Sequence, residues 1–392
     1  GEAAVVTRST AVPDTNPECR AALERGIPLY GRPEILGAIS ALRQTIAVAG
    51  THGKTTTSSM LALVLREAGL RPSFIIGGDV NEIGTGAAWD EGDLLVVEAD
   101  ESDGSFLELS TRFGLVTNLE PDHLEHHGGF DPLLEAFDRF VEAVDGPVLV
   151  GADDEQGAAL AQRHATSTVG TSVGSDWRLS GVVESWEGVR FTLTGPASGA
   201  FELELPVPGL HNARNAASAA AMAITAGAAP EAAASALARF GGVARRFEHR
   251  GQVAGIVLVD DYAHLPTEVG AVLATARSGG FNRVVAVFQP HRFSRTEALW
   301  SSFGYSFDDA DVLYVTDVYP SGEAPRPGVS GRLVADAVLR DRPGADVRYV
   351  ARREDLLDAL SGELRDGDLC LTMGAGDLTA VPDQLRARLG AF

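Results

Sequence analysis

The chain has 392 residues, of which 45% are hydrophobic and 22% charged, and its formal net charge is −22. This length suggests two or three domains with sizeable cores, and the acidic balance argues against nucleic acid or an anionic membrane as a partner. Cys19 and Cys370 form neither a disulfide framework nor a metal-binding pattern, and no stretch approaches the roughly 20 apolar residues of a membrane span. We therefore expect a cytoplasmic protein without membrane insertion.

Residues 1–44 have the texture of an incomplete α/β domain. We predict a strand, a helix, a strand and a helix at 3–7, 16–25, 28–30 and 33–42. Four such elements are too few for a domain of ordinary size, and the chain starts in what reads as the middle of one. We expect an N-terminal piece to be missing.

The strongest motif opens the next region. An apolar strand at 45–49 leads through the turn G-T-H-G-K into a helix predicted at 54–68. Gly50 and Gly53 permit backbone angles that are closed to other residues. The N–H groups of such a turn and of the following helix N-terminus are suited to cradle phosphate.

Lys54 is the only lysine among the 32 Lys and Arg residues. A compact ammonium reaches into a tight loop that a planar guanidinium does not fit, so this placement is a separate indication of a phosphate site. Lys54 would neutralise the β- and γ-phosphates, and the Thr55 hydroxyl would hold Mg²⁺. Val48 stands where the common phosphate loop has its first glycine, so the loop is a shorter variant.

Two further predicted strands, at 94–98 and 114–117, also end in polar residues. Glu98 follows four apolar residues, so we expect it to be the most buried of a carboxylate run that also contains Asp100, Glu101 and Asp103. A carboxylate at this sheet edge would hold the metal, whereas the alternative is a solvated acidic loop. His123 follows the second strand and is either a metal ligand or a structural histidine.

Short strands predicted at 189–193 and 201–205 favour an antiparallel addition before two alanine-rich helices. Asn212 and Asn215 share one helix face and suit recognition of adenine, although capping or interhelical bonding is the alternative. Arg245-Arg246 could clamp phosphate across a cleft, or could belong to a solvated linker.

Residues 247–392 restart the alternation of strands and helices, which predicts a second doubly wound sheet. The expected strands are 256–259, 283–288, 312–316, 346–349 and 368–372, and the expected helices are 266–277, 295–303 and 331–339. Two of these strands end in D-D-Y-A-H-L-P-T-E and F-Q-P-H-R-F-S-R-T. Arg292 and Arg295 in the second segment could bind carboxylate oxygens.

In chain order, these segments resemble the Mur ligase family. The resemblance rests on G-T-H-G-K-T-T, E-A-D-E-S-D-G-S-F, T-N-L-E-P-D-H, H-N-A-R-N-A, R-R-F, D-D-Y-A-H-L-P-T-E and F-Q-P-H-R-F-S-R-T, and covers essentially the whole chain. It implies a three-domain α/β architecture. Residues 1–44 would be a remnant of an N-terminal Rossmann-like, UDP-sugar-binding domain, 45–246 a central P-loop ATPase-type parallel-sheet domain, and 247–392 a C-terminal Rossmann-like, amino-acid-binding domain.

The resemblance also implies a reaction that requires ATP and Mg²⁺. ATP phosphorylates the lactyl carboxylate of UDP-N-acetylmuramate, and the amine of L-alanine attacks the acyl phosphate to give an amide, ADP and phosphate. This reaction belongs to cytoplasmic peptidoglycan precursor synthesis, and so to cell wall biogenesis, cell shape and division. D-E-S-D-G-S-F and F-Q-P-H-R-F-S-R-T favour this alanine-adding branch over the alternative, a peptide-recycling ligase acting on the same sugar. We expect a monomer or homodimer.

Motif and resemblance together assign the site residues. The catalytic residues would be Lys54, Glu98, His123, His264 and Arg292. The ATP-binding residues would be Gly50, Thr51, His52, Gly53, Lys54, Thr55, Thr56, His211, Asn212, Asn215, Arg246 and Asp261. The substrate-binding residues would be Tyr262, His264, Arg292, Arg295, Ser9, Thr10 and Arg32. Thr55, Glu98 and His123 would bind Mg²⁺.

Two departures from the family pattern affect these roles. Leu265 stands where the family has a second histidine, so His264 is expected to carry the function. Some sister ligases use a carbamoylated lysine to bridge metals, which a chain with Lys54 as its single lysine cannot do. Because the front of the sugar-nucleotide domain is expected to be absent, we also expect this chain to bind ATP and Mg²⁺ but to bind UDP-sugar poorly.

Overall fold

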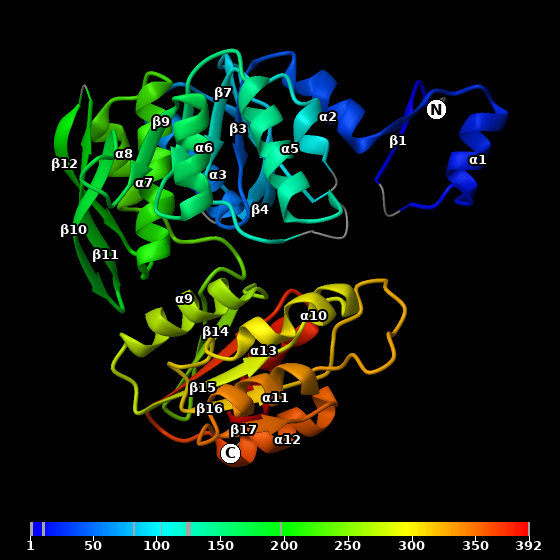
Figure 1. Ribbon diagram of the computed structural model, residues 1–392, viewed down its shortest axis with the longest axis vertical. Helices are drawn as coiled ribbons and strands as arrows, with labels where there is room; N and C mark the ends of the chain where they lie inside the picture. The colour runs from blue at the N-terminus through cyan, green and yellow to red at the C-terminus, as the bar shows by residue number, and fades with distance from the viewer. Residues whose placement is uncertain are drawn as a thin grey trace.

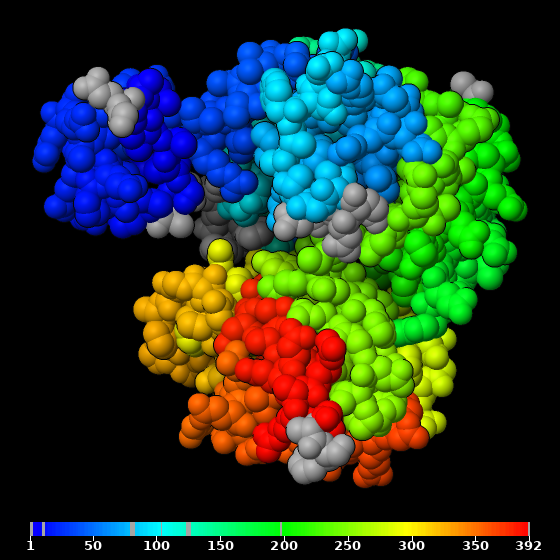
Figure 2. All heavy atoms as spheres, turned by 180° about the vertical axis from the view of Figure 1, so that it is seen from behind, coloured from blue at the N-terminus to red at the C-terminus, as the bar shows by residue number. Residues whose placement is uncertain are grey.

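The computed structural model describes residues 3–9, 12–80, 83–102, 104–122, 127–196 and 198–390. The first segment follows the predicted order, as β1 (Val6–Arg8), α1 (Pro17–Glu24), β2 (Leu29–Gly31) and α2 (Arg32–Ser40). β1 and β2 pair in parallel, with Val6 opposite Leu29. This small unit projects from one side of the molecule (Figures 1 and 2).

The central sheet has ten strands in the order β12-β11-β10-β9-β8-β7-β3-β6-β4-β5. Their bounds are β3 (Gln44–Ala49), β4 (Ser73–Val80), β5 (Thr85–Ala88), β6 (Leu94–Glu98), β7 (Phe113–Val116), β8 (Val148–Gly151), β9 (Ser167–Gly170), β10 (Trp177–Ser185), β11 (Gly188–Gly195) and β12 (Gly199–Leu205). The neighbouring strands β10, β9, β8, β7, β3, β6 and β4 run parallel, while β5, β11 and β12 pair antiparallel. The predicted antiparallel addition therefore extends the parallel sheet and does not form a separate one.

Helices cover both faces of this sheet. One face carries α3 (Lys54–Glu67), α7 (Leu210–Thr225) and α8 (Pro230–Leu237), and the other carries η1 (Ser105–Glu108), α5 (Phe130–Glu142) and α6 (Glu155–His164). Along β3, Ile46 and Val48 pack toward the first face, and Ala47 and Ala49 toward the second. A strand that is buried on both faces has no polar side, which is why β3 is apolar from Ile46 to Ala49.

Helix α7 owes its place to its alanines. Its alanines from Ala213 to Ala223 are all fully buried against the sheet and α3. Side chains this small let the helix approach its neighbours closely. The N-terminal end of α7 is thereby brought next to the turn between β3 and α3.

The C-terminal sheet has the order β13-β14-β18-β15-β16-β17 and is parallel except for β13. Its strands are β13 (Glu248–Val253), β14 (Ile256–Asp261), β15 (Arg283–Phe288), β16 (Val312–Val315), β17 (Val347–Tyr349) and β18 (Asp368–Met373). One face carries α9 (Pro266–Arg277), α10 (Phe293–Leu299), η2 (Trp300–Phe303) and α11 (Arg332–Asp341), and the other carries α12 (Arg353–Glu363), η3 (Asp377–Ala380) and α13 (Val381–Leu389). The doubly wound sheet is as predicted, whereas α12 and α13 were not among the expected helices.

The two large sheets stack one above the other, joined by the segment after α8 (Figure 1). Arg245 and Phe247 both adopt left-handed backbone angles there, with φ of 60° and 51°. Asp261 stabilises this turn by accepting a 2.6 Å hydrogen bond from the Phe247 N–H. The predicted domain bounds fall at the start of β3 and between α8 and β13. Among the described residues, no helix is both long and apolar enough to cross a membrane.

Candidate active site

The turn between β3 and α3 is held tightly by its surroundings. Gly50 has φ of 125°, and a Cβ there would lie 2.2 Å from Thr117 Oγ1. Gly53 has φ of 76°, and a Cβ there would lie 2.4 Å from Asn215 Oδ1. Both positions therefore require glycine twice over, because of backbone angle and because of space. The end of β7 and the start of α7 thus fix the path of the loop.

Lys54 folds back over this loop. Its Nζ donates to the carbonyl oxygens of Gly50 at 2.6 Å and Thr51 at 3.3 Å, and lies 2.8 Å from the carboxylate of Glu101. Glu101 is only 1% exposed. Burial disfavours the charged form of both groups. At Lys54 the nearby Glu101 carboxylate outweighs burial, so the pKa of Lys54 lies above its usual value. At Glu101 burial outweighs the effect of Lys54 and raises the pKa to about 7.

Glu101 was not singled out from the sequence, which pointed to Glu98 as the most buried of the acidic run. That expectation was wrong, since Glu98 is only half-buried. The chain turns after β6 and brings Glu101 under Lys54. The signal that could have found it is the lysine itself, since a buried ammonium needs a counter-charge.

Thr55 and Glu98, two of the three predicted metal ligands, do meet. Thr55 Oγ1 donates to Glu98 Oε1 at 2.9 Å, and the Gly77 N–H donates to Glu98 Oε2 at 2.6 Å. A hydroxyl and a carboxylate are the hard oxygen donors that Mg²⁺ prefers, and it commonly takes one or two carboxylates together with substrate phosphates. The donor set beside the loop therefore fits Mg²⁺. Within the described ranges, no group of three or more His, Cys, Asp or Glu residues suits a metal.

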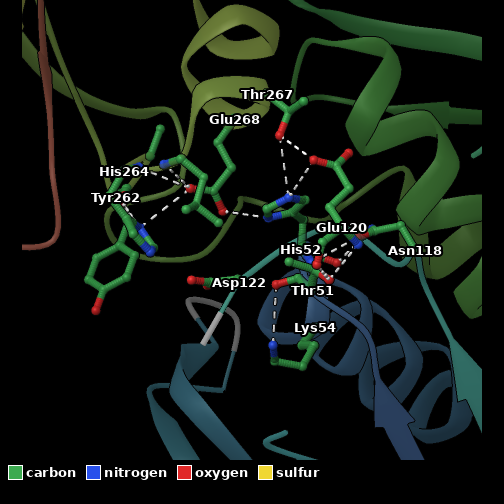
Figure 3. A network of polar contacts seen from close by, with 12 residues as sticks. Thr51, His52, Lys54, Asn118, Glu120, Asp122, Tyr262, His264, Thr267 and Glu268 are labelled. Atoms are coloured by element: carbon green, nitrogen blue, oxygen red, sulfur yellow. Dashed lines mark hydrogen bonds and ion pairs between the residues drawn. The ribbon is translucent and has the colours of Figure 1, made fainter. Parts of the chain in front are cut away.

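His52, at the middle of the loop, faces two carboxylates (Figure 3). Its Nδ1 lies 3.0 Å from Glu268 Oε1, and its Nε2 lies 3.2 Å from Glu120 Oε2. Burial disfavours charge on this imidazole, but Glu268 and Glu120 outweigh that effect and raise its pKa to about 9. His52 is therefore an imidazolium at neutral pH.

A cavity of about 400 Å³ opens on one side of the loop, between the central and C-terminal sheets. Eight of the predicted ATP-binding residues line it, namely His52, Gly53, Thr56, His211, Asn212, Asn215, Arg246 and Asp261. Burial, together with Arg246 and Arg214, lowers the pKa of His211 to about 4, so this imidazole is neutral. The cavity thus offers amide groups and a neutral imidazole beside two arginines, Arg214 and Arg246, a lining that can hold a base together with anionic groups.

A second cavity, of about 690 Å³, opens on the other side of the same loop. The predicted site residues on its walls are Arg32, Thr51, His52, Gly53, Lys54, Thr55, Glu98, Arg246, Tyr262, His264, Arg292 and Arg295. His52, Gly53, Arg246 and Glu268 line both cavities. The phosphate loop therefore forms part of the wall that the two cavities share.

The chain matches two family descriptions, "Mur ligase middle domain" over residues 48–223 and "Mur ligase, glutamate ligase domain" over residues 245–376. It is 45% identical over 384 residues to a protein of Nitratidesulfovibrio vulgaris (strain DP4) named UDP-N-acetylmuramate–L-alanine ligase, covering 97% of this chain and 84% of that one. A protein of the same name from Kineococcus radiotolerans is 47% identical, covering 95% of this chain and 80% of its own. The chain belongs to the Mur ligase family.

Solved structures of Mur ligases share this architecture. UDP-N-acetylmuramate-alanine ligase of Thermotoga maritima superposes with a TM-score of 0.83 at 28% identity, covering 99% of this chain and 85% of that one. A murein peptide ligase of Psychrobacter arcticus has a TM-score of 0.70 at 24% identity, covering 97% and 85%, a likeness of fold alone. The predicted three-domain α/β Mur ligase fold is confirmed.

Some predicted site residues of this Mur ligase are already engaged by the protein. Asp261 accepts two backbone N–H bonds at 2.6 Å, from Phe247 and Ala263. Asn212 Nδ2 donates to the Pro208 carbonyl oxygen at 2.7 Å, which ties this side chain to the backbone just before α7. Such bonds hold these side chains in place on the cavity wall.

The arginines of the junction and of the C-terminal part are engaged as well. Arg295 forms a buried ion pair with Asp122 of the central part, 3.0 Å apart. Arg245 and Arg246 both lie over the Tyr262 ring at 5.0 Å, so they are not a solvated linker. Arg292 is the N-cap residue of α10, with a positive φ of 67°, and it lines the second cavity.

Three predicted site residues are not among those described at the two cavities. Ser9 belongs to the N-terminal unit and lines neither cavity. Thr10 and His123 lie outside the described residues. Their proposed roles in sugar and metal binding stay predictions.

His264 is held as a neutral imidazole of defined tautomer. Its Nδ1 lies 3.0 Å from the Tyr262 carbonyl oxygen, which only accepts, so Nδ1 carries the hydrogen and Nε2 keeps its lone pair. Burial lowers the pKa of His264 to about 4, although Glu268 opposes this. His291, whose ring lies 5.9 Å away, is also neutral, because burial lowers its pKa to about 3.

Alanine substitutions at two glycines with nearly the same backbone angle distinguish the effect of backbone strain from the effect of crowding. Gly69, with φ of 75° and open space around it, matches Gly53, with φ of 76°. We predict that Gly69→Ala loses about 1–2 kcal/mol of stability in denaturant unfolding, and that Gly53→Ala loses at least as much because crowding adds to the same backbone strain. Only Gly53→Ala should also lose affinity for an ATP analogue, by about tenfold or more in calorimetry, because Asn215 must move. Equal affinities would contradict the crowding.

The histidines should titrate far apart. At pH 7, ¹⁵N NMR should find His52 charged, while His211 and His264 are neutral. The pKa of His52 lies above its ordinary 6.5, so its contribution to stability is complete below that pH and is lost as the pH rises through about 9. Titration of His52 at or below 6.5 would contradict the pairing with Glu120 and Glu268.

Proposed function

We propose that this chain is an ATP-dependent ligase that joins the lactyl carboxylate of UDP-N-acetylmuramate to L-alanine through an acyl phosphate, releasing ADP and phosphate. Its place is peptidoglycan precursor synthesis and cell wall biogenesis. The observation that carries the proposal is identity of 45% across 97% of the chain to a ligase of that name. The phosphate loop between two cavities supports it, because the reaction must bring a nucleotide and a carboxylate to one phosphoryl group.

The nucleotide occupies the first cavity, with its phosphates on the loop. The backbone N–H groups at the start of α3 and the Lys54 ammonium face the phosphate oxygens, and they stabilise charge that spreads over the transferring phosphoryl group. Lys54 is held ready by Glu101 and by two loop carbonyls. Mg²⁺, held by Thr55 and Glu98, would neutralise further phosphate charge.

The sugar carboxylate occupies the second cavity, where Arg292 binds it. One carboxylate oxygen attacks the γ-phosphorus, the bond to the bridging oxygen breaks, and ADP leaves. The product is a mixed anhydride that water would destroy, so the burial of the site beneath the C-terminal part protects it.

L-alanine then attacks the anhydride carbon. Its amine must first lose a proton, because an ammonium has no lone pair. Nε2 of His264 carries a lone pair on the wall of the second cavity, and it accepts this proton. The carbon–nitrogen bond forms, phosphate leaves with the carboxylate oxygen that it gained, and the departing phosphate takes the second proton that the nitrogen loses.

The alternative is a recycling ligase that attaches a ready-made peptide to the same sugar. The similar murein peptide ligase structure, at 24% identity, supports only the fold. The relatives at 45% and 47% identity are named for L-alanine. They favour the single amino acid as acceptor.

The compound that accepts the muramoyl group distinguishes the alanine-adding ligase from the recycling ligase. We predict that ADP release from ATP, Mg²⁺ and UDP-N-acetylmuramate is driven by L-alanine and not by the tripeptide L-alanyl-D-glutamyl-diaminopimelate. A coupled ADP assay with mass spectrometry of the product measures this. A chain that used the tripeptide and ignored L-alanine would be the recycling ligase.

Lys54→Arg tests the role of the lysine in the same assay, since it keeps the positive charge and changes the shape of the charged group. We expect turnover to fall by about 100-fold or more, with the thermal unfolding transition retained, because the guanidinium does not fit the loop. Turnover like that of the wild type would remove the argument from the single lysine.

A further inference from the structure

His52 joins two parts of the chain that are far apart in sequence. It belongs to the phosphate loop, whereas Glu268 is the third residue of α9 in the C-terminal part. Figure 3 shows the ring lying between the Glu268 and Glu120 carboxylates. The side chains of His52 and Glu268 are 15% and 13% exposed, so the pair is largely shielded from water.

Both ring nitrogens of His52 must donate. A carboxylate only accepts, and each nitrogen lies within 3.2 Å of one. Hydrogen bonds between charged groups are about twice as strong as neutral ones. Removing one partner of a shielded ion pair leaves the charge of the other buried and unpaired, which is costly. The pair therefore favours the one position of α9 in which Glu268 meets His52.

The backbone of His52 cannot move independently of the central sheet. Its N–H donates to Asn118 Oδ1 at 2.9 Å, and its carbonyl accepts from Asn118 Nδ2 at 3.0 Å and from Thr117 Oγ1 at 2.6 Å. Three bonds thus tie this one residue to the end of β7. The imidazole therefore moves only when the phosphate loop moves.

Glu268 is fixed just as firmly at the other end. While Oε1 faces His52, Oε2 accepts the backbone N–H of His264 at 2.9 Å and of Leu265 at 3.2 Å. The carboxylate that meets the phosphate loop therefore also holds the loop that carries His264. A second bond, from Thr267 Oγ1 to Glu120 Oε2 at 2.5 Å, runs beside it.

We propose that His52 is a positioning residue that sets, through Glu268, the distance between the phosphate loop and the His264 loop. The inference rests on the proposed function, in which the acyl phosphate forms beside the first loop and the amine is held beside the second. A misplacement of 1 Å at such a centre can cost about 100-fold in rate. This direct tie between the two loops fixes that spacing.

The test is a double-mutant cycle of His52→Gln and Glu268→Gln. The glutamine at 268 keeps an oxygen to accept the His264 N–H, so the start of α9 is spared. We expect each single variant to lower kcat/KM for L-alanine by about 10–100-fold, and the double variant to lose no more than the worse single one. A purely structural role would give a lower melting temperature without a specific effect on L-alanine.

Glu231→Gln is the matched control, because Glu231 also lies in the first turn of a helix, α8, but is exposed. It should behave as the wild type does. If Glu268→Gln does not fold, Glu268→Asp keeps the charge and withdraws it by one methylene, and it should reproduce the loss. Additive losses, or unchanged L-alanine kinetics in both single variants, would overturn the proposal.

A second measurement is independent of activity. Spin labels at Val183→Cys on β10 and Tyr305→Cys beyond η2, which are 62% and 66% exposed, report the spacing of the two large sheets. Cys19 and Cys370 are buried and should not be labelled. Electron–electron double resonance should show a narrow distance distribution that broadens with His52→Gln or Glu268→Gln. An unchanged distribution would overturn the tie, whereas a wild-type chain that made no amide would overturn only the proposed function.

Discussion

The crowding around the phosphate loop is the constraint on which the rest of the site depends. Gly50 lies against Thr117 and Gly53 against Asn215, with no room for a methyl group at either place. The loop therefore cannot shift without moving the end of β7 or the start of α7. Because α7 is packed through alanines, its N-terminal end has little freedom to retreat. A rigid loop gives the phosphoryl group a fixed position.

Every other part of the site is arranged around that loop. Lys54 is held by Glu101 on one side, and His52 reaches Glu120 and Glu268 on the other. Residues of the loop line both cavities, in which we propose that the nucleotide and the sugar carboxylate bind. A chain with a net charge of −22 has thus placed its one lysine and a charged histidine at the loop where we propose that phosphate binds. Acidic partners hold both until then.

Local sequence patterns were enough to predict the loop, because a strand, two glycines and a helix start follow one another within a few residues. They did not predict the partners of Lys54 and His52. His52 and Glu268 are 216 residues apart, and nothing in either neighbourhood encodes their meeting. The burial of Glu101 instead of Glu98 follows from how the chain turns after β6, which the apolar pattern of that strand does not specify. The helices α12 and α13 near the C-terminus were likewise harder to predict, because charged residues interrupt the apolar pattern within both.

We propose that phosphate is transferred at this loop onto a carboxylate bound in the neighbouring cavity. The most direct test uses UDP-N-acetylmuramate with ¹⁸O in its carboxylate, and ³¹P NMR of the phosphate released during amide formation. One ¹⁸O atom should appear in each phosphate, because the carboxylate oxygen that attacked phosphorus leaves with it. Phosphate that carries only the oxygen isotope of the solvent would contradict the account.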